Sequence, residues 1–221
     1  MNSFLPWHAT PDTGPVAARI AAATAERIVD GRLGAGEWVT EAGIAEPWGA
    51  SRTPAREAMV QLSRWGLVRL VPKKGALVTT VTPEERRDLL DVRVMVECRA
   101  VETVADERPA LVTRLAEVVA AQREALERGD ISTFADLDVT FHLGIIGAGG
   151  NAVVDELMAT LGPRFARLIH HAVTGNPRAA TVFCDEHARL AELVAAGDSS
   201  AFETLLERHV AFGHGLAGQA R

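Results

Sequence analysis

The sequence predicts a mainly α-helical protein in two parts, a smaller N-terminal part that ends in a short hairpin and a larger all-helical part. Strand-like runs rich in Val, Leu and Thr occur only within residues 67–81. Helix-terminating Gly, Pro and Asp residues recur along the rest of the chain. Hydrophobic residues make up 48% and charged residues 24% of the 221 residues, the balance of an ordinary globular protein.

The N-terminal part contains three predicted helices followed by a hairpin. Residues 1–14 show no periodicity and are expected to form a loose arm. The helices are predicted over residues 16–29, from Thr40 to near Pro47, and from Ser51 to Gly66. The β-rich runs 67–71 and 76–81 are joined by Pro72-Lys73-Lys74-Gly75, which suits a hairpin turn. This order of elements predicts a winged helix-turn-helix over residues 15–81.

After Thr82-Pro83 no strand-like run appears again. Six amphipathic helices are predicted, at about 84–106, 110–128, 131–147, 152–173, 178–196 and 199–214. Asp130, Asn151 and Asp198 stand where a helix N-cap is expected. Residues 84–214 are therefore predicted to form an antiparallel six-helix bundle, in which a ligand site is built from inward side chains.

Composition excludes several classes of protein. The two cysteines, Cys98 and Cys184, are too few for a disulfide framework or a cysteine-built zinc site. No apolar run approaches the roughly 20 residues of a membrane helix. The first 30 residues lack the basic start and apolar block of a secretory signal. We therefore expect a cytoplasmic protein with no membrane partner.

Positive charge is concentrated near the predicted hairpin, although the whole chain has a net charge of −6. Residues 51–75 carry six basic groups against one acid, Glu57. The chain's two lysines, Lys73 and Lys74, fall beside Gly75 at the hairpin tip, where a wing approaches DNA. A basic end on an acidic protein often faces phosphates, but a chance cluster would look the same by charge alone.

The third predicted helix begins with residue types that read DNA. Arg52 and Arg56 lie four residues apart and share one helix face, and arginine can form two hydrogen bonds with O6 and N7 of guanine. Ser51 and Thr53 can donate to phosphates at the helix start. A solvated helix face is the alternative explanation for the two arginines.

Three histidines, His142, His187 and His209, each interrupt an apolar stripe of a predicted bundle helix. Asp138 precedes His142 by four residues, so the two side chains project from one face. Carboxylate and neutral imidazole together suit Zn, Ni, Mn, Fe or Co. Each histidine alone is more often a hydrogen-bonded core residue, and Asp138 alone could be salt-bridged. Four such groups on three helices favour a divalent metal.

The N-terminal part also carries five short motifs. They are Gly31-x-Leu33-x-x-Gly36, Glu41-x-x-Ile44-Ala45, Ser51-Arg52-Thr53-Pro54-Ala55-Arg56-Glu57-Ala58, Gly66-Leu67-Val68 and Lys74-Gly75-Ala76. Together they closely resemble the GntR family of bacterial transcription regulators. The resemblance implies that Arg52 and Arg56 read bases and phosphates and that Lys74-Gly75 is the wing contact. Pro47-Trp48 departs from the family pattern, and the proline should shorten the second helix by a turn.

A second set of motifs lies in the bundle. They are Arg93-x-x-x-Glu97, Asp138-x-x-x-His142, Gly150-Asn151, Glu186-His187, Gly197-Asp198 and His209. They look like the FCD-type helical ligand-binding domain of the FadR subfamily, and six helices rather than seven resemble its VanR-like branch. Many members hold a divalent metal through one Asp and three His, which implies Asp138, His142, His187 and His209 as ligands. The resemblance further implies a small carboxylate effector beside the metal.

Three positions form the predicted effector site. Arg93 is the implied clamp, because a guanidinium binds a carboxylate through two hydrogen bonds; a surface ion pair with Glu97 is the alternative. Arg164 and His171 share a helix stripe, so they are expected to line the same cavity unless they form a buried structural pair.

These observations predict a homodimeric transcription regulator rather than an enzyme. Two winged domains would bind double-stranded DNA at an inverted-repeat operator, because two-fold protein symmetry matches a palindromic site. The metal and a small organic acid effector would control operator affinity from the bundle. Two rivals are a metal-dependent hydrolase or oxygenase fused to a DNA-binding domain, and a DNA-binding protein whose polar cavity is only structural.

Overall fold

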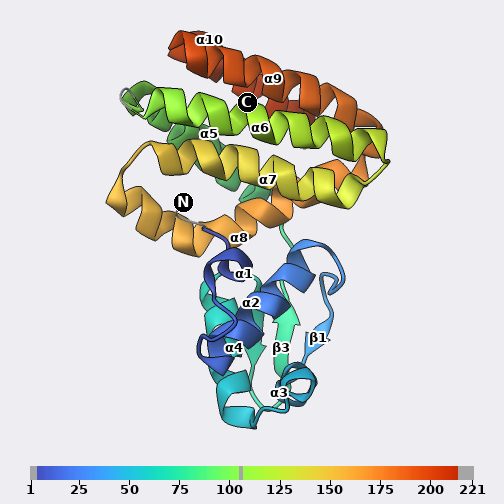
Figure 1. Cartoon of the computed structure of the whole chain (residues 1–221). Helices are drawn as coiled ribbons and strands as arrows, with labels where there is room; N and C mark the ends of the chain where they lie inside the picture. The colour runs from blue at the N-terminus through green and yellow to red at the C-terminus, as the bar shows by residue number, and fades with distance from the viewer. Residues whose placement is uncertain (1–3, 105–106, 214–221) are drawn as a thin grey trace. The chain divides into compact units, whose positions relative to one another are not determined.

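The computed structural model describes residues 4–104 and 107–213. These residues form two compact units (Figure 1). The first contains the described residues up to Pro83 together with Asp155–Leu168, and the second contains Glu84–Val154 and the described residues from Ile169 onward. Helix α8 (Ala152–Gly175) therefore contributes to both units. Sequence periodicity gives no sign of this division, because it runs unbroken along the helix.

The first unit is built on three helices and a three-stranded sheet. They are α2 (Val16–Val29), α3 (Glu41–Ala45), α4 (Arg52–Arg64), β1 (Trp38–Val39), β2 (Val68–Val71) and β3 (Gly75–Val78). The sheet is antiparallel in the order β1-β3-β2, with Val71 paired to Gly75 at the turn. Ile20, Leu62 and Leu67 are fully buried in its core. The predicted winged helix-turn-helix is confirmed.

Local chemistry explains how the helices of this unit begin and end. The Thr40 hydroxyl accepts from the Gly43 amide at 3.1 Å and caps α3. As predicted, Pro47 shortens that helix, and the chain continues as the 3₁₀ turn η1 (Glu46–Trp48). Ser51 occupies the N-cap position of α4, but its side chain makes no capping hydrogen bond.

Two elements of the first unit escape the sequence analysis. The described part of the predicted loose arm contains the helix α1 (Pro6–Ala9), so that expectation is wrong there. Phe4 and Leu5 are buried, and Trp7 packs against the core. Strand β1 has only two residues. Segments this short show no measurable period, so only tertiary packing reveals them.

The second unit contains the predicted six-helix bundle. Its helices are α5 (Pro83–Thr103), α6 (Arg108–Glu127), α7 (Ile131–Ala148), the end of α8, α9 (Ala180–Ala196) and α10 (Ser199–Gly213), with the 3₁₀ turn η2 (Pro177–Ala179) before α9. Helix α6 packs against α7 and α9, and α10 packs against α9 (Figure 1). Asp130, Asn151 and Asp198 each accept a backbone amide hydrogen bond at a helix start, as predicted.

The interior of the bundle is mostly apolar. Phe134, Phe141 and Phe202 are fully buried. Among them lie six buried polar side chains that converge on one region: Glu97, Gln122, Asp138, His142, His187 and His209. Buried polar groups persist only when they are paired or bind a ligand, so this region is the candidate site.

None of the helices in residues 4–104 and 107–213 combines the length and apolar character needed to cross a membrane.

Candidate metal centre and DNA-binding surface

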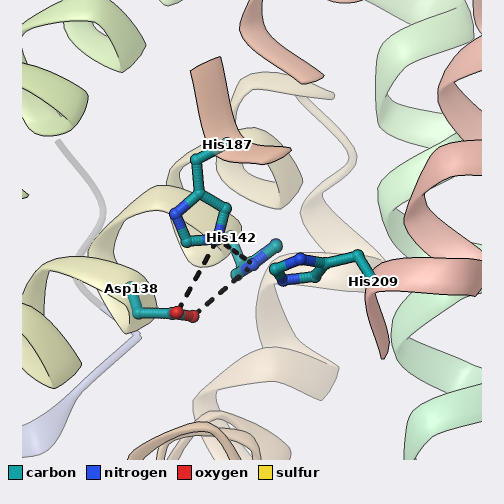
Figure 2. A group of neighbouring side chains, drawn as sticks. All are labelled: Asp138, His142, His187 and His209. Atoms are coloured by element: carbon teal, nitrogen blue, oxygen red, sulfur yellow. Dashed lines mark hydrogen bonds and ion pairs between the residues drawn. The ribbon is translucent and has the colours of Figure 1, made fainter. Parts of the chain in front are cut away.

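The four side chains predicted as metal ligands converge inside the second unit. Asp138 and His142 project from α7 one turn apart, His187 comes from α9 and His209 from α10 (Figure 2). All four residues are buried, with at most 4% of their surface exposed. One ligand atom from each residue lies within 4.8 Å of the others. The structure thus brings together groups that are up to 71 residues apart in the sequence.

The spacing of these atoms suits one metal ion. His142 Nε2 lies 3.2 Å from His187 Nε2 and 3.5 Å from Asp138 Oδ1. His187 Nε2 lies 3.6 Å from Asp138 Oδ2. Ligand atoms bound to a tetrahedral ion at about 2.0–2.1 Å are about 3.3 Å apart. The three imidazole centroids are 4.9, 5.0 and 5.2 Å apart, so the rings surround a common point.

Each imidazole is also hydrogen-bonded through Nδ1. The contacts are His142 to Glu97 Oε2 at 2.8 Å, His187 to Gln122 Oε1 at 2.9 Å, and His209 to Glu186 Oε2 at 2.8 Å. Carboxylate and amide oxygens only accept, so each Nδ1 carries the proton. The Nε2 lone pairs of His142 and His187 then face each other at 3.2 Å. A cation between them relieves this repulsion, so the donor set fits a metal.

Burial sets the protonation of the cluster. Loss of hydration raises the pKa of Asp138 to about 7, and the Arg93 charge offsets this only in part. Loss of hydration also lowers the pKa of His187 well below its usual value, with the nearby His209 and His142 adding to the effect. Neutral imidazoles are the form that binds metal. The site therefore disfavours protons on His187 and His209 and leaves the Asp138 carboxylate poorly neutralised.

Arg93 lies beside this cluster. It is 3% exposed, and its Nε donates to Glu97 Oε1 at 2.8 Å. Arg93 and Glu97 do form an ion pair, but the pair is buried and does not lie on the surface. Its Nη2 is buried and has no hydrogen-bond partner among the described residues. Arg93, Asp138 and His209 line a cavity of about 10 Å³. An unpartnered guanidinium nitrogen beside a metal-ligand set is suited to an anion.

The structure does not bring Arg164 and His171 to this cavity, which corrects the expectation that they line it. Arg164 falls in the first unit, where it packs against Gly66. His171 is exposed. The face of α8 that lines the cavity carries Ile169, Ala172 and Val173 instead. These positions follow the helical spacing of three and four, and they lie on a different side of the helix.

The predicted DNA-contacting residues gather in the first unit. Arg52 and Arg56 on α4 line one side of a hollow of about 620 Å³, and Lys73, Lys74 and Gly75 of the wing line the other. Ser51 and Thr53 are exposed at the start of α4 and do not line the hollow. Recognition helix and wing thus share one basic concave surface, which suits a nucleic acid backbone.

Neighbouring side chains orient two of these basic groups. Arg56 Nε donates to Glu41 Oε1 at 2.9 Å, which holds the guanidinium over the start of α3. Lys74 Nζ lies 6.0 Å from the Trp38 ring centroid. Sequence reasoning missed the role of Glu41, although it quoted the residue as part of a motif, because nothing in the spacing shows which side chains meet.

Comparison with known proteins identifies the family of each unit. The family described as "Bacterial regulatory proteins, gntR family" matches residues 16–78, and the FCD domain family matches residues 88–212. The chain belongs to the GntR family and carries an FCD domain. The GntR match contains the whole basic hollow, and the FCD match contains Asp138 and the three clustered histidines. The relatives of this GntR-family chain are transcriptional regulators, not enzymes.

The proteins similar to this GntR-family regulator include two repressors of sugar or sugar-acid operons and two solved structures. It is 28% identical to a probable D-xylose utilization operon transcriptional repressor of Paenarthrobacter nicotinovorans, over 83% of this chain and 80% of that one. It is 30% identical to the gluconate operon transcriptional repressor of Bacillus subtilis, over 71% and 63% of the two chains. The crystal structure of a GntR regulator from Rhodococcus sp. RHA1 has a TM-score of 0.77 at 24% identity, covering 93% and 99%. The E. coli McbR/YncC structure has a TM-score of 0.79 at 20% identity, covering 93% and 98%. These two structures share the fold.

Proposed function

We propose that this GntR-family regulator binds a divalent metal ion and a small carboxylate effector in its FCD domain, and that effector binding changes its affinity for DNA. The metal ligands are Asp138, His142, His187 and His209, and Arg93 receives the carboxylate. The convergence of four buried ligand atoms within 4.8 Å carries the proposal. Zn, Ni, Mn, Fe and Co all suit this set of three imidazoles and one carboxylate.

The residues around the cluster support a carboxylate as the effector. A bound divalent ion supplies a positive centre that can accept a carboxylate oxygen. Arg93 Nη2 supplies a hydrogen-bond donor that has no partner among the described residues. The cavity of about 10 Å³ holds roughly one water-sized group, so it must enlarge to admit a carboxylate, and short carboxylates need the least enlargement. Gluconate, for which one relative's operon is named, is a longer carboxylate and tests how far the cavity can open.

We also propose the assembly in which this switch works. Residues 15–81 form the DNA-binding domain and residues 84–214 the metal and effector domain. Two copies form a homodimer that binds an inverted-repeat operator, because the symmetry of the protein then matches that of the DNA. Arg52, Arg56 and the wing tip make the contacts with the duplex. Light scattering of the purified protein, with and without operator DNA, tests this assembly.

Elemental analysis of protein purified without chelator tests the metal. We expect a stoichiometric divalent ion in the wild type and its loss in His187→Ala. His171→Ala is the matched control, because His171 is an exposed histidine of α8 and should keep the ion. A wild-type protein that contains no ion and takes up none of the five candidate metals contradicts the proposal.

Fluorescence anisotropy on a DNA fragment from upstream of the protein's own gene tests the effector. Acetate, malonate and gluconate are titrated into the metal-loaded protein, and at least one is expected to shift the DNA dissociation constant. Arg93→Met should abolish that shift and leave DNA binding itself intact. If a broad panel of carboxylates leaves DNA affinity unchanged with metal bound, the effector proposal is wrong.

A further inference from the structure

The three imidazoles of the cluster share an arrangement that no sequence motif indicates. Each one meets a single acceptor through Nδ1, and each acceptor comes from a helix other than that of its histidine. Glu97 on α5 contacts His142, Gln122 on α6 contacts His187, and Glu186 on α9 contacts His209. Glu97 and Gln122 are fully buried. The acceptors therefore form a second layer around the ligands.

A hydrogen bond at Nδ1 decides which ring nitrogen can bind metal. A neutral imidazole carries one proton, and the nitrogen that bears it cannot be a ligand. When Nδ1 donates to an acceptor, the lone pair is left on Nε2 and the ring cannot rotate without breaking the bond. Here the Nε2 atoms of His142 and His187 are 3.2 Å apart, on the side where Asp138 lies.

We propose that Glu97, Gln122 and Glu186 are positioning residues that select Nε2 as the ligand atom of all three histidines and so set the metal affinity of the site. This inference rests on the metal site of the proposed function. It adds to that site the residues that determine ligand atom and affinity, one of which, Gln122, belongs to none of the sequence motifs.

Of the three acceptors, Glu97 is the most firmly held in place. Its two oxygens are both engaged, Oε2 with His142 and Oε1 with Arg93 at 2.8 Å, so its orientation is fixed from both sides. Glu186 is less constrained, since its side chain is 15% exposed and its other oxygen lies 3.6 Å from Arg208. Gln122 is neutral, and its amide Nε2 has no partner among the described residues. The hydrogen bond that the Gln122 Oε1 accepts from His187 Nδ1 is therefore the contact that explains why this polar side chain is buried.

Metal affinity of the full-length protein tests the proposal. Dissociation constants for Zn²⁺ and Co²⁺ are measured by competition with a chromophoric chelator. Glu97→Gln leaves one acceptor oxygen for the two donors of His142 and Arg93, and Gln122→Leu leaves no acceptor for His187. Both are expected to weaken binding by about 10- to 100-fold, and Glu186→Gln by less. Gln122→Glu keeps an acceptor oxygen for His187 Nδ1 and should bind metal about as tightly as the wild type. Glu102→Gln, at an exposed glutamate of the same helix as Glu97, should bind metal as the wild type does.

The design separates positioning from general stability and from the metal site itself. The Co²⁺ absorption spectrum should change in Glu97→Gln and Gln122→Leu, which loss of folding stability alone does not produce. Wild-type affinity in both variants overturns the inference while leaving the metal site intact. Failure of the wild type to bind any metal overturns the proposed function and this inference with it.

A measurement on the wild type decides the matter even where a variant fails to fold. Long-range ¹H–¹⁵N spectra of the Zn²⁺-loaded protein report which nitrogen of each imidazole carries the proton. All three histidines are expected to be protonated at Nδ1 and ligated through Nε2. A zinc-bound Nδ1 at His142, His187 or His209 refutes the selection of Nε2 at that ring.

Discussion

Asp138 is expected to destabilise the metal-free protein at neutral and alkaline pH, because burial deprives its carboxylate of hydration. Its pKa is about 7 in the folded chain, against about 3.9 in an unfolded chain. The folded state thus binds the proton more tightly. This carboxyl group therefore contributes a loss of stability that begins above about pH 4 and is complete above about pH 7.

The difference of about three pKa units corresponds to at most about 4 kcal/mol of unfolding free energy at pH 8. At pH 5 only about 1.5 kcal/mol of that loss is present. Asp138→Asn keeps the shape of the side chain and never ionises. The metal-free variant is therefore expected to be more stable than the metal-free wild type, by an amount that grows roughly 2–3 kcal/mol from pH 5 to pH 8.

Urea unfolding of both proteins in chelator at the two pH values measures this difference. Asp136→Asn is the control, since Asp136 is exposed on the same helix and should change stability little at either pH. Saturating Zn²⁺ should stabilise the wild type more than Asp138→Asn, because the variant keeps only the three imidazole ligands, and should therefore reduce or reverse the difference between them. A variant that is less stable than the wild type at pH 8 without metal, or a difference that does not depend on pH, refutes the reasoning.

The remaining predictions concern the DNA-binding unit. Arg56→Ala should weaken operator binding by about 1–3 kcal/mol if it reads a guanine, whereas Arg99→Ala, at an exposed arginine of α5, should not; loss of salt dependence with unchanged base preference would make Arg56 a phosphate contact. Gly75→Ala should destabilise the wing, because φ is +106° and a Cβ would overlap the Val39 carbonyl oxygen; a thermal melt equal to that of the wild type contradicts this. Lys73 has a φ of 64°, so Lys73→Gly should raise the unfolding free energy by about 1 kcal/mol. The same variant should bind DNA more weakly, because it loses a positive charge. A lower unfolding free energy in Lys73→Gly contradicts the strain argument.

The bounds of the longer helices follow closely from the sequence. Helix α2 occupies Val16–Val29 as predicted, because its apolar positions recur at helical spacing and Asp30-Gly31 ends it. The caps at Asp130, Asn151 and Asp198 also follow from local chemistry. Helix α1 and strand β1 do not, since each is too short to show a period.

Some features of the candidate site could likewise be predicted from the sequence, and others could not. Asp138 and His142 share a face because they are four residues apart on one helix, which the sequence alone determines. The stripe argument fails for Arg164 and His171, because a shared face does not say what that face packs against. The role of Gln122 could not be predicted from the sequence, because a single glutamine in an amphipathic helix forms no recognisable motif with its neighbours.

The fold class, the bounds of the longer helices, the basic wing tip and the aspartate–histidine pair on one helix could be predicted from the sequence. These features depend on interactions between residues near one another in the chain. Tertiary packing was needed to show that three imidazoles meet at one point, that each is held by an acceptor from another helix, and that Arg93 lines the same cavity. Those contacts depend on which helix faces pack together, and that is settled by the shapes of side chains distant in sequence.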